Sequence, residues 1–230
     1  IHLSDLHFHR DNNDNQDIIA TLKNVNIKYP KHYVVITGDI TDDGHEIQYD
    51  NAFEHLKQFM GRIFITPGNH DFGAMGNFYS KERAKRFDQL LSIPLKQGGT
   101  FYKENKPVVN IVKDKNDTVM FIGLDTNLET THPFDFACGE VGDTQLEALS
   151  YILDSPMLPE MKKVVFFHHH PFMHRDPFME LKDAERLARV LYNKVNVILF
   201  GLGSCDACRK AAKQLAAAGY SVLRVDVRAD

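Results

Sequence analysis

Apolar and polar positions repeat along the chain with two different periods, which predicts a mixture of strands and helices. Short apolar runs, typical of buried strands, occur at residues 1–4, 32–37 and 62–66. Between these runs, residues 15–27 and 46–60 carry apolar side chains at the spacing of one helix face. The first part of the chain therefore predicts strands that are separated by helices.

The rest of the pattern predicts a hairpin and a second set of alternating elements. The apolar segments VVNIVKD and DTVMFIGLD flank the polar sequence KDKND, which is typical of a turn between antiparallel strands. Helical spacing follows at 143–153 and 181–193, and strand patterns occur at 163–168 and 195–200. Buried strands with helices between them predict an α/β fold, and the hairpin indicates a second sheet.

The composition is that of a globular protein, and it argues against some partners. Of 230 residues, 43% are hydrophobic and 25% are charged, with a net charge of −4, which argues against nucleic acid held by general electrostatics. No apolar run has the roughly 18–20 residues of a membrane helix, so we expect no membrane partner. Cys138, Cys205 and Cys208 do not make a disulfide framework, which favours a reducing, cytoplasmic location. The chain starts at Ile1 inside a predicted strand, so a targeting segment that has been removed stays an alternative.

Four short segments with potential metal ligands each follow a predicted strand. They are LSDLH with Asp5 and His7, ITGDITDDG with Asp39, TPGNHD with Asn69, His70 and Asp71, and VVFFHHHPF with His168, His169 and His170. Ligands bind beyond the carboxyl ends of strands in open α/β sheets. Oxygen donors mixed with imidazoles suit divalent ions such as Mn, Fe or Zn. One such segment alone has a structural explanation, for example an Asx turn at GNHD, but four at successive strand ends predict a metal site.

On these motifs, residues 1–201 resemble the calcineurin-like metallophosphoesterases. The motifs Asp-x-His, Gly-Asp, Gly-Asn-His-Asp and a His before x-Pro all match. The pair GDITDDG and PGNHD is more similar to the branch of cyclic-nucleotide and glycerophosphodiester phosphodiesterases than to the protein phosphatases. The resemblance implies an α/β/β/α domain, a two-sheet sandwich flanked by helices. It also implies a hydrolase with two divalent or trivalent ions (Mn, Fe or Zn) and a small phosphate-ester substrate.

The resemblance further implies a metal ligand set. Asp5 and His7 would hold one ion, Asn69 and His169 would hold the other, and Asp39 would bridge the two. A carboxylate suits the bridging position, because two cations about 3.5–4 Å apart can share its oxygens.

Other residues of the same segments would act around the metal ions. By the same resemblance, His70 would lie near the leaving oxygen as an acid or charge stabiliser, oriented by Asp71. His168, His170 and His174 would either line the substrate pocket or form a solvated rim.

The last motif of the family, Gly-His-x-His, is incomplete in this sequence. Gly201 is present, but Leu202 and Ser204 occupy the positions of the two His, so each ion would lose one ligand. Losing even an outer partner of a metal ligand costs about 10–100-fold in affinity. We therefore expect weakened metal binding and impaired activity.

Residues 202–230 differ in composition from the rest of the chain. They are rich in Ala and contain no His, Phe or Asn, which suggests either two sequence sources or one chain with an Ala-rich last helix. They resemble the first β-α-β unit of arsenate-reductase-like proteins of the thioredoxin class, which makes the last β-α-β atypical for a metallophosphoesterase. Cys205 would match the reactive thiol of those proteins. The alternatives are thus a thiol-redox or arsenate-reductase-like activity at Cys205, metal capture by Cys205 and Cys208, and a scaffold that binds a partner without turnover.

Overall fold

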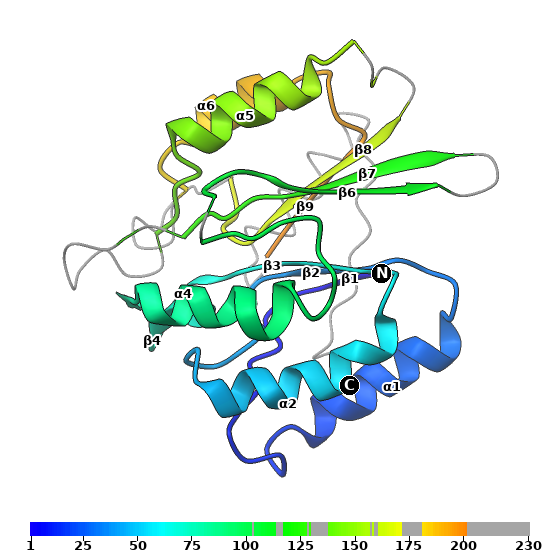
Figure 1. Cartoon of the computed structure of the whole chain (residues 1–230), viewed down its shortest axis with the longest axis vertical. Coiled ribbons are helices and arrows are strands. Elements are labelled where there is room, and N and C mark those ends of the chain that lie inside the picture. The colour runs from blue at the N-terminus through cyan, green and yellow to red at the C-terminus, as the bar shows by residue number, and fades with distance from the viewer. Residues whose placement is uncertain are drawn as a thin grey trace.

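A computed structural model describes most of the chain as four stacked layers. The described residues are 1–102, 104–113, 117–127, 129, 138–156, 158, 161–171 and 181–201. Figure 1 shows helices below a first sheet, a second sheet above it, and two further helices on top. This arrangement confirms the predicted α/β/β/α sandwich. The predicted atypical unit at 202–230, with Cys205 and Cys208, lies outside the described residues.

The first sheet is parallel and has the strand order β1-β2-β3. Its strands are β1 (His2–Leu3), β2 (Val34–Thr37) and β3 (Ile63–Thr66). Its outer face packs on helices α1 (Gln16–Lys28), α2 (Glu46–Leu56) and α4 (Lys81–Phe87). The side chains of a strand alternate between faces, so Val34 and Ile36 pack toward these helices while Val35 packs toward the second sheet.

The second sheet has the order β6-β7-β8-β9 and is mixed. The predicted hairpin is its antiparallel pair β6 (Val108–Lys113) and β7 (Thr118–Gly123), and β8 (Lys162–Phe167) and β9 (Val197–Phe200) extend it in parallel. Helices α5 (Asp143–Leu153) and α6 (Ala184–Leu191) cover the outer face.

Aromatic side chains join the two sheets. Phe64 of β3 stacks on Phe121 of β7 with ring centroids 4.0 Å apart, and Phe166 of β8 and Val35 of β2 belong to the same buried cluster. Burying one such side chain contributes about 1.5–3 kcal/mol. This contact holds β2 and β8 in the same region, so the segments that follow these two strands can meet.

The structure confirms the predicted elements, with shifted ends, and adds several short ones. The predicted helix at 46–60 is α-helical to Leu56 and continues as the 3-10 turn Lys57–Phe59, and the helix expected at 181–193 is Ala184–Leu191. The added elements are α3 (Asn69–Phe72), the hairpin β4 (Gly73–Ala74) and β5 (Phe78–Tyr79), α4, and a π-helical turn at Asp88–Ser92. Within the described parts of the chain, no helix is long and apolar enough to cross a membrane.

Candidate metal centre

The candidate ligands lie on loops that follow the carboxyl ends of strands. Asp5 comes after β1, Asp39 after β2, Asn69 after β3 and His168 directly after β8. The first three loops are adjacent because their strands are neighbours in one parallel sheet. His168 arrives from the second sheet, and its ring Nδ1 is 2.8 Å from the carbonyl oxygen of Thr37 at the end of β2.

Three candidate ligands have a backbone conformation that L-residues seldom adopt. The φ angles of Asp5, His7 and Asp39 are 56°, 49° and 50°. Backbone hydrogen bonds hold these loops together, with the His7 N–H donating to the Asp39 carbonyl at 2.9 Å and the Asp5 N–H to the Gly38 carbonyl at 3.2 Å. Positive φ in residues other than glycine costs free energy and concentrates at functional sites. Its occurrence at these three residues favours a binding role for the two loops that follow β1 and β2.

The Asp39 carboxylate is the centre of the cluster. It is buried, and its Oδ2 lies 3.3 Å from His168 Nε2 and 3.9 Å from His7 Nε2. Its Oδ1 accepts a 3.0 Å hydrogen bond from the backbone N–H of His70. Asp39 therefore joins the loops of the first sheet to the loop that follows β8.

Two groups of potential ligands share Asp39. One consists of His7, Asp39 and His70 and the other of Asp5, Asp39 and His168, with one ligand atom of each residue within 4.8 Å of the others. Asn69 joins the second group, since its Oδ1 lies 3.0 Å from His168 Nε2. Asp5 Oδ2 and His7 Nδ1 are buried without a hydrogen-bond partner. Such unpartnered donor atoms in a mixed oxygen and imidazole set fit divalent ions.

The ring that reaches this cluster belongs to His168, whereas the sequence interpretation placed His169 there. The His169 Nδ1 instead lies 2.8 Å from Thr126 Oγ1, and its ring packs so closely on Gly139 that a Cβ there would overlap it. His169 Nε2 is buried without a hydrogen-bond partner. Burial, with the nearby charge of His168, lowers the pKa of His169 to about 3, so this ring is neutral.

Asp71 also differs from its expected role, because its carboxylate binds backbone groups rather than His70. Its oxygens accept hydrogen bonds from the N–H groups of Gly68 at 2.9 Å, Ile40 at 3.2 Å and Thr41 at 2.8 Å. The Thr41 hydroxyl adds a fourth at 2.9 Å. Asp71 thus fastens the loop after β3 to the loop after β2. The His70 Nδ1 lies 2.7 Å from the Asp42 carbonyl, which orients that ring instead.

The charges in the cluster shift the pKa values of its members. Burial by itself would raise the pKa of Asp39, but the charge and hydrogen bond of His168 lower it below the usual range. Burial opposes a charge on His168 too, yet the Asp39 charge raises the pKa of His168 to about 10. Burial lowers the pKa of His7, although Asp39 opposes this. The buried carboxylate therefore favours positive charge beside it, as a cation site requires.

Gly76 has no Cβ, which allows its turn to lie close to the side chains of Asn69 and His70. A Cβ on Gly76, in the turn of the β4–β5 hairpin, would lie 2.5 Å from Asn69 Nδ2 and 2.7 Å from His70 Nε2. The Gly76 carbonyl accepts a hydrogen bond from Asn69 Nδ2 at 3.1 Å, which fixes the amide orientation and directs Asn69 Oδ1 toward His168. Sequence reasoning did not find Gly76, because its turn carries no ligand-type residue.

Gly201 ends the described chain directly beside the cluster. Its N–H donates to the His168 carbonyl at 2.7 Å, and a Cβ there would lie 2.7 Å from His168 Nδ1. Leu202 and Ser204, at the positions of the two absent His, lie outside the described residues, as does His174.

Comparison with known proteins finds a matching family and similar curated proteins. The family model for calcineurin-like phosphoesterases matches residues 1–201. A probable glycerophosphodiester phosphodiesterase of Arcobacter nitrofigilis is 26% identical over 183 residues, which are 77% of this chain and 58% of that protein. A probable cyclic nucleotide phosphodiesterase of Coxiella burnetii is 50% identical over 38 residues, 16% of this chain and 15% of that protein.

Among solved structures, one crystal structure aligns over 87% of this chain and 82% of the solved chain, with a TM-score of 0.49 and 14% identity. The chain spans little more than half of the Arcobacter relative and a small part of the Coxiella relative. The family match covers nearly the whole chain, including every strand of the two sheets and both groups of potential ligands. The chain therefore belongs to the calcineurin-like phosphoesterase family.

Proposed function

We propose that the chain is a phosphodiesterase that uses two metal ions, with Asp39 as the bridging ligand. The observation that carries this proposal is the membership of Asp39 in both groups of potential ligands. The resemblance gives Asp5 and His7 to one ion and Asn69 to the other. In the structure Asp5 lies in the group of His168 and Asn69, whereas His7 lies with His70, so Asp5 would hold the second ion and His7 the first. His168 would take the place that the sequence interpretation assigned to His169, because its Nε2 contacts both Asp39 and Asn69.

Two such ions would supply charge stabilisation for a phosphoryl group and a water of lowered pKa. The chain's own residues would provide orientation and proton transfer. The His70 Nδ1 lies 2.7 Å from the Asp42 carbonyl, so this nitrogen would carry a hydrogen and would leave Nε2 to act toward the substrate. His70 can donate a proton at Nε2 only as an imidazolium, and in that form it would also stabilise charge on a leaving oxygen.

The proposed substrate is a small phosphodiester. The two curated relatives are named for glycerophosphodiesters and cyclic nucleotides, which share a phosphate with two ester bonds. The proposed catalytic domain comprises residues 1–201, with 202–230 as a tail packed on it. Because Leu202 and Ser204 replace two His ligands, we propose that this chain binds its ions weakly and turns over slowly.

The proposal is tested by metal analysis together with hydrolysis of bis(p-nitrophenyl) phosphate. Asp39→Asn should lose bound Mn or Zn and at least about a hundredfold in rate, since both ions would lose a ligand. Asp50→Asn is the matched control, because Asp50 is an exposed carboxylate on α2. Full metal content and full rate in Asp39→Asn would refute the bridging role.

A second pair of variants separates the two candidate histidines. His168→Ala should reduce Mn affinity by at least about tenfold, whereas His169→Ala should leave it much closer to the parent value. Calorimetric titration with Mn measures both variants. The opposite order would restore His169 as the ligand and would contradict the arrangement around Asp39.

A further inference from the structure

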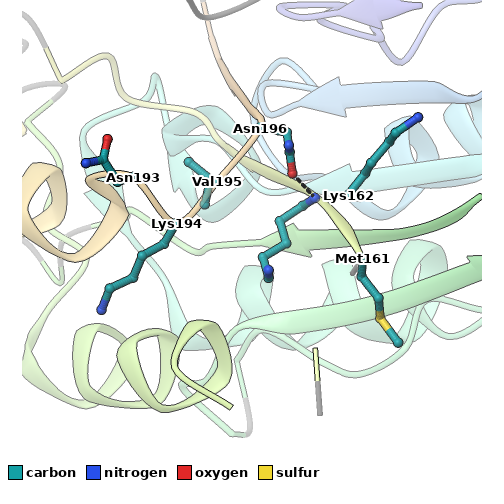
Figure 2. Close-up of a pocket in the computed structure, with 7 residues that line it drawn as sticks. Met161, Lys162, Asn193, Lys194, Val195 and Asn196 are labelled. Carbon is teal, nitrogen blue, oxygen red and sulfur yellow. Dashed lines mark hydrogen bonds between the residues drawn. The ribbon is translucent and has the colours of Figure 1, made fainter. Parts of the chain in front are cut away.

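A second polar site lies at the other end of β8, away from the metal centre. A cavity of about 250 Å³ is lined there by Met161, Lys162, Lys163, Asn193, Lys194, Val195 and Asn196. These residues come from the start of β8 and from the segment between α6 and β9, and Figure 2 labels six of them. Lys163 stands at the start of β8 and His168 directly after its end, so their Cα atoms are roughly 17 Å apart for five residues of extended chain. The cavity is therefore independent of the candidate ligands.

Lys163 has a buried side chain with no partner for its charge. It is 8% exposed, and it lies on the face of β8 that carries Val165 and Phe167, which pack under α5 and α6. In the part of the chain that the structure describes, its ammonium makes neither a hydrogen bond nor an ion pair. A buried lysine is rarely unpaired. Its aliphatic stem packs on apolar neighbours, and its ammonium extends to the nearest solvent or polar cavity. For Lys163 that space is the cavity it lines.

The other two lysines of the cavity are paired. Lys194 Nζ lies 2.6 Å from one carboxylate oxygen of Asp154, and Lys162 Nζ lies 3.0 Å from Asp117 Oδ2. The two aspartates balance these two charges. The charge of Lys163 is left uncompensated, so the cavity carries a net positive charge among the described residues.

An amide adds hydrogen-bond donors next to this charge. Asn196 Oδ1 accepts the backbone N–H of Lys163 at 2.7 Å, the contact drawn as a dashed line in Figure 2, and the Asn196 N–H donates to the Lys163 carbonyl at 3.0 Å. With its oxygen engaged, Asn196 presents its Nδ2 hydrogens as donors. An amide with free donors and an ammonium without a partner among the described residues, both lining one cavity, suit the oxygens of a small anion.

We propose that the Lys163 cavity binds a compact oxyanion of the phosphate type, either inorganic phosphate or the phosphate group of a small metabolite. Lys163 supplies the charge and Asn196 supplies neutral donors. The volume is several times the roughly 30 Å³ of one water, so a phosphate fits together with bridging waters. Nothing in the metal centre is needed for this binding.

The test measures the reactivity of single lysines in the full chain. Sulfo-NHS-acetate acetylates accessible lysines, and peptide mass spectrometry gives the rate for each one. Inorganic phosphate at ten times its dissociation constant should slow acetylation of Lys163 about tenfold, because about one site in eleven stays free. Lys162, whose side chain is 58% exposed, is the internal control and should react at an unchanged rate. Glycerol phosphate in a parallel sample distinguishes a phosphomonoester from the free ion.

The proposal fails if phosphate leaves the Lys163 rate unchanged, or if chloride at equal ionic strength protects it equally. A variant gives an independent test. Lys163→Met keeps the apolar stem and removes the charge, so phosphate affinity from calorimetry should fall about tenfold or more. If Lys163 instead stabilises the carboxyl ends of α5 and α6, this variant will be less stable but will bind phosphate as the parent does. That result would also overturn the proposal.

Discussion

Replacing Gly76 with alanine should weaken metal binding without removing any candidate ligand. Gly76 has a φ of +71°, so an alanine there costs about 1–2 kcal/mol in the left-handed backbone. The new Cβ would also lie 2.5 Å from Asn69 Nδ2 and 2.7 Å from His70 Nε2, so both side chains must move. Displacing Asn69 breaks its hydrogen bond to the Gly76 carbonyl, and losing such an orienting partner typically costs about 10–100-fold in metal affinity.

Gly61 offers a matched control for the backbone part of this effect. Its φ is +84°, and a Cβ there would have nothing within 4 Å. Gly61→Ala should therefore lose a similar 1–2 kcal/mol of unfolding free energy while binding Mn as the parent does. Urea denaturation measures the stability of both variants, and calorimetric titration with Mn measures the affinity. Equal Mn affinity in Gly76→Ala and the parent would refute the placement of Asn69 at the metal centre, and an equal loss in both variants would show a general backbone effect.

Three further predictions concern other parts of the chain. Asp71→Ala should cost about 4 kcal/mol or more in urea unfolding, because four buried donors lose their acceptor; a loss below about 1 kcal/mol would contradict this. Burial raises the pKa of Asp125 to about 7, so the folded state favours the neutral carboxyl. This contribution to the free energy of unfolding is complete below pH ~4, the usual pKa of an Asp, and is lost as the pH rises through about 7. Urea titrations of the parent should accordingly lose stability relative to Asp125→Asn between pH 5 and 8, and parallel curves would exclude this role. Leu202→His combined with Ser204→His should raise Mn affinity about 10–100-fold, since Gly201 lies against His168; unchanged affinity would mean that this segment does not reach the metals.

The pattern of apolar residues predicted the elements with a strong period and missed those without one. The helix predicted at 143–153 is α5 with the same ends, because its buried face includes Leu146, Leu149 and Leu153 at helical spacing. The strongly charged helix α4, KERAKRF, buries only Ala84 and Phe87, so its sequence carries little periodic signal. The hairpin β4–β5 has two-residue strands around Gly76, and such short pairs depend on tertiary contacts more than on local sequence.

The candidate site was predictable to the level of residue type and strand position. Asp5, His7, Asp39 and Asn69 follow their strands as expected, because parallel neighbours place their carboxyl ends together. The role of Asp71 was not predictable from its position beside His70. A buried carboxylate near backbone N–H groups of a tight loop binds those groups, and the number of such groups becomes known only when the loops are packed.

The alternation of side chains along β8 is a sequence signal that distinguishes His168 from His169. Motif spacing favoured His169, which stands two residues before Pro171. The alternation of β8 favours His168, because Phe166 packs between the two sheets and Phe167 packs toward α5 and α6. A side chain two positions after Phe166 continues toward the first sheet, where Asp39 and Asn69 lie. His169 continues on the side of Phe167 and meets Thr126 and Gly139. The face on which a strand carries its last residues therefore decides which of two adjacent histidines reaches Asp39 and Asn69, and a motif defined by spacing alone does not contain that information.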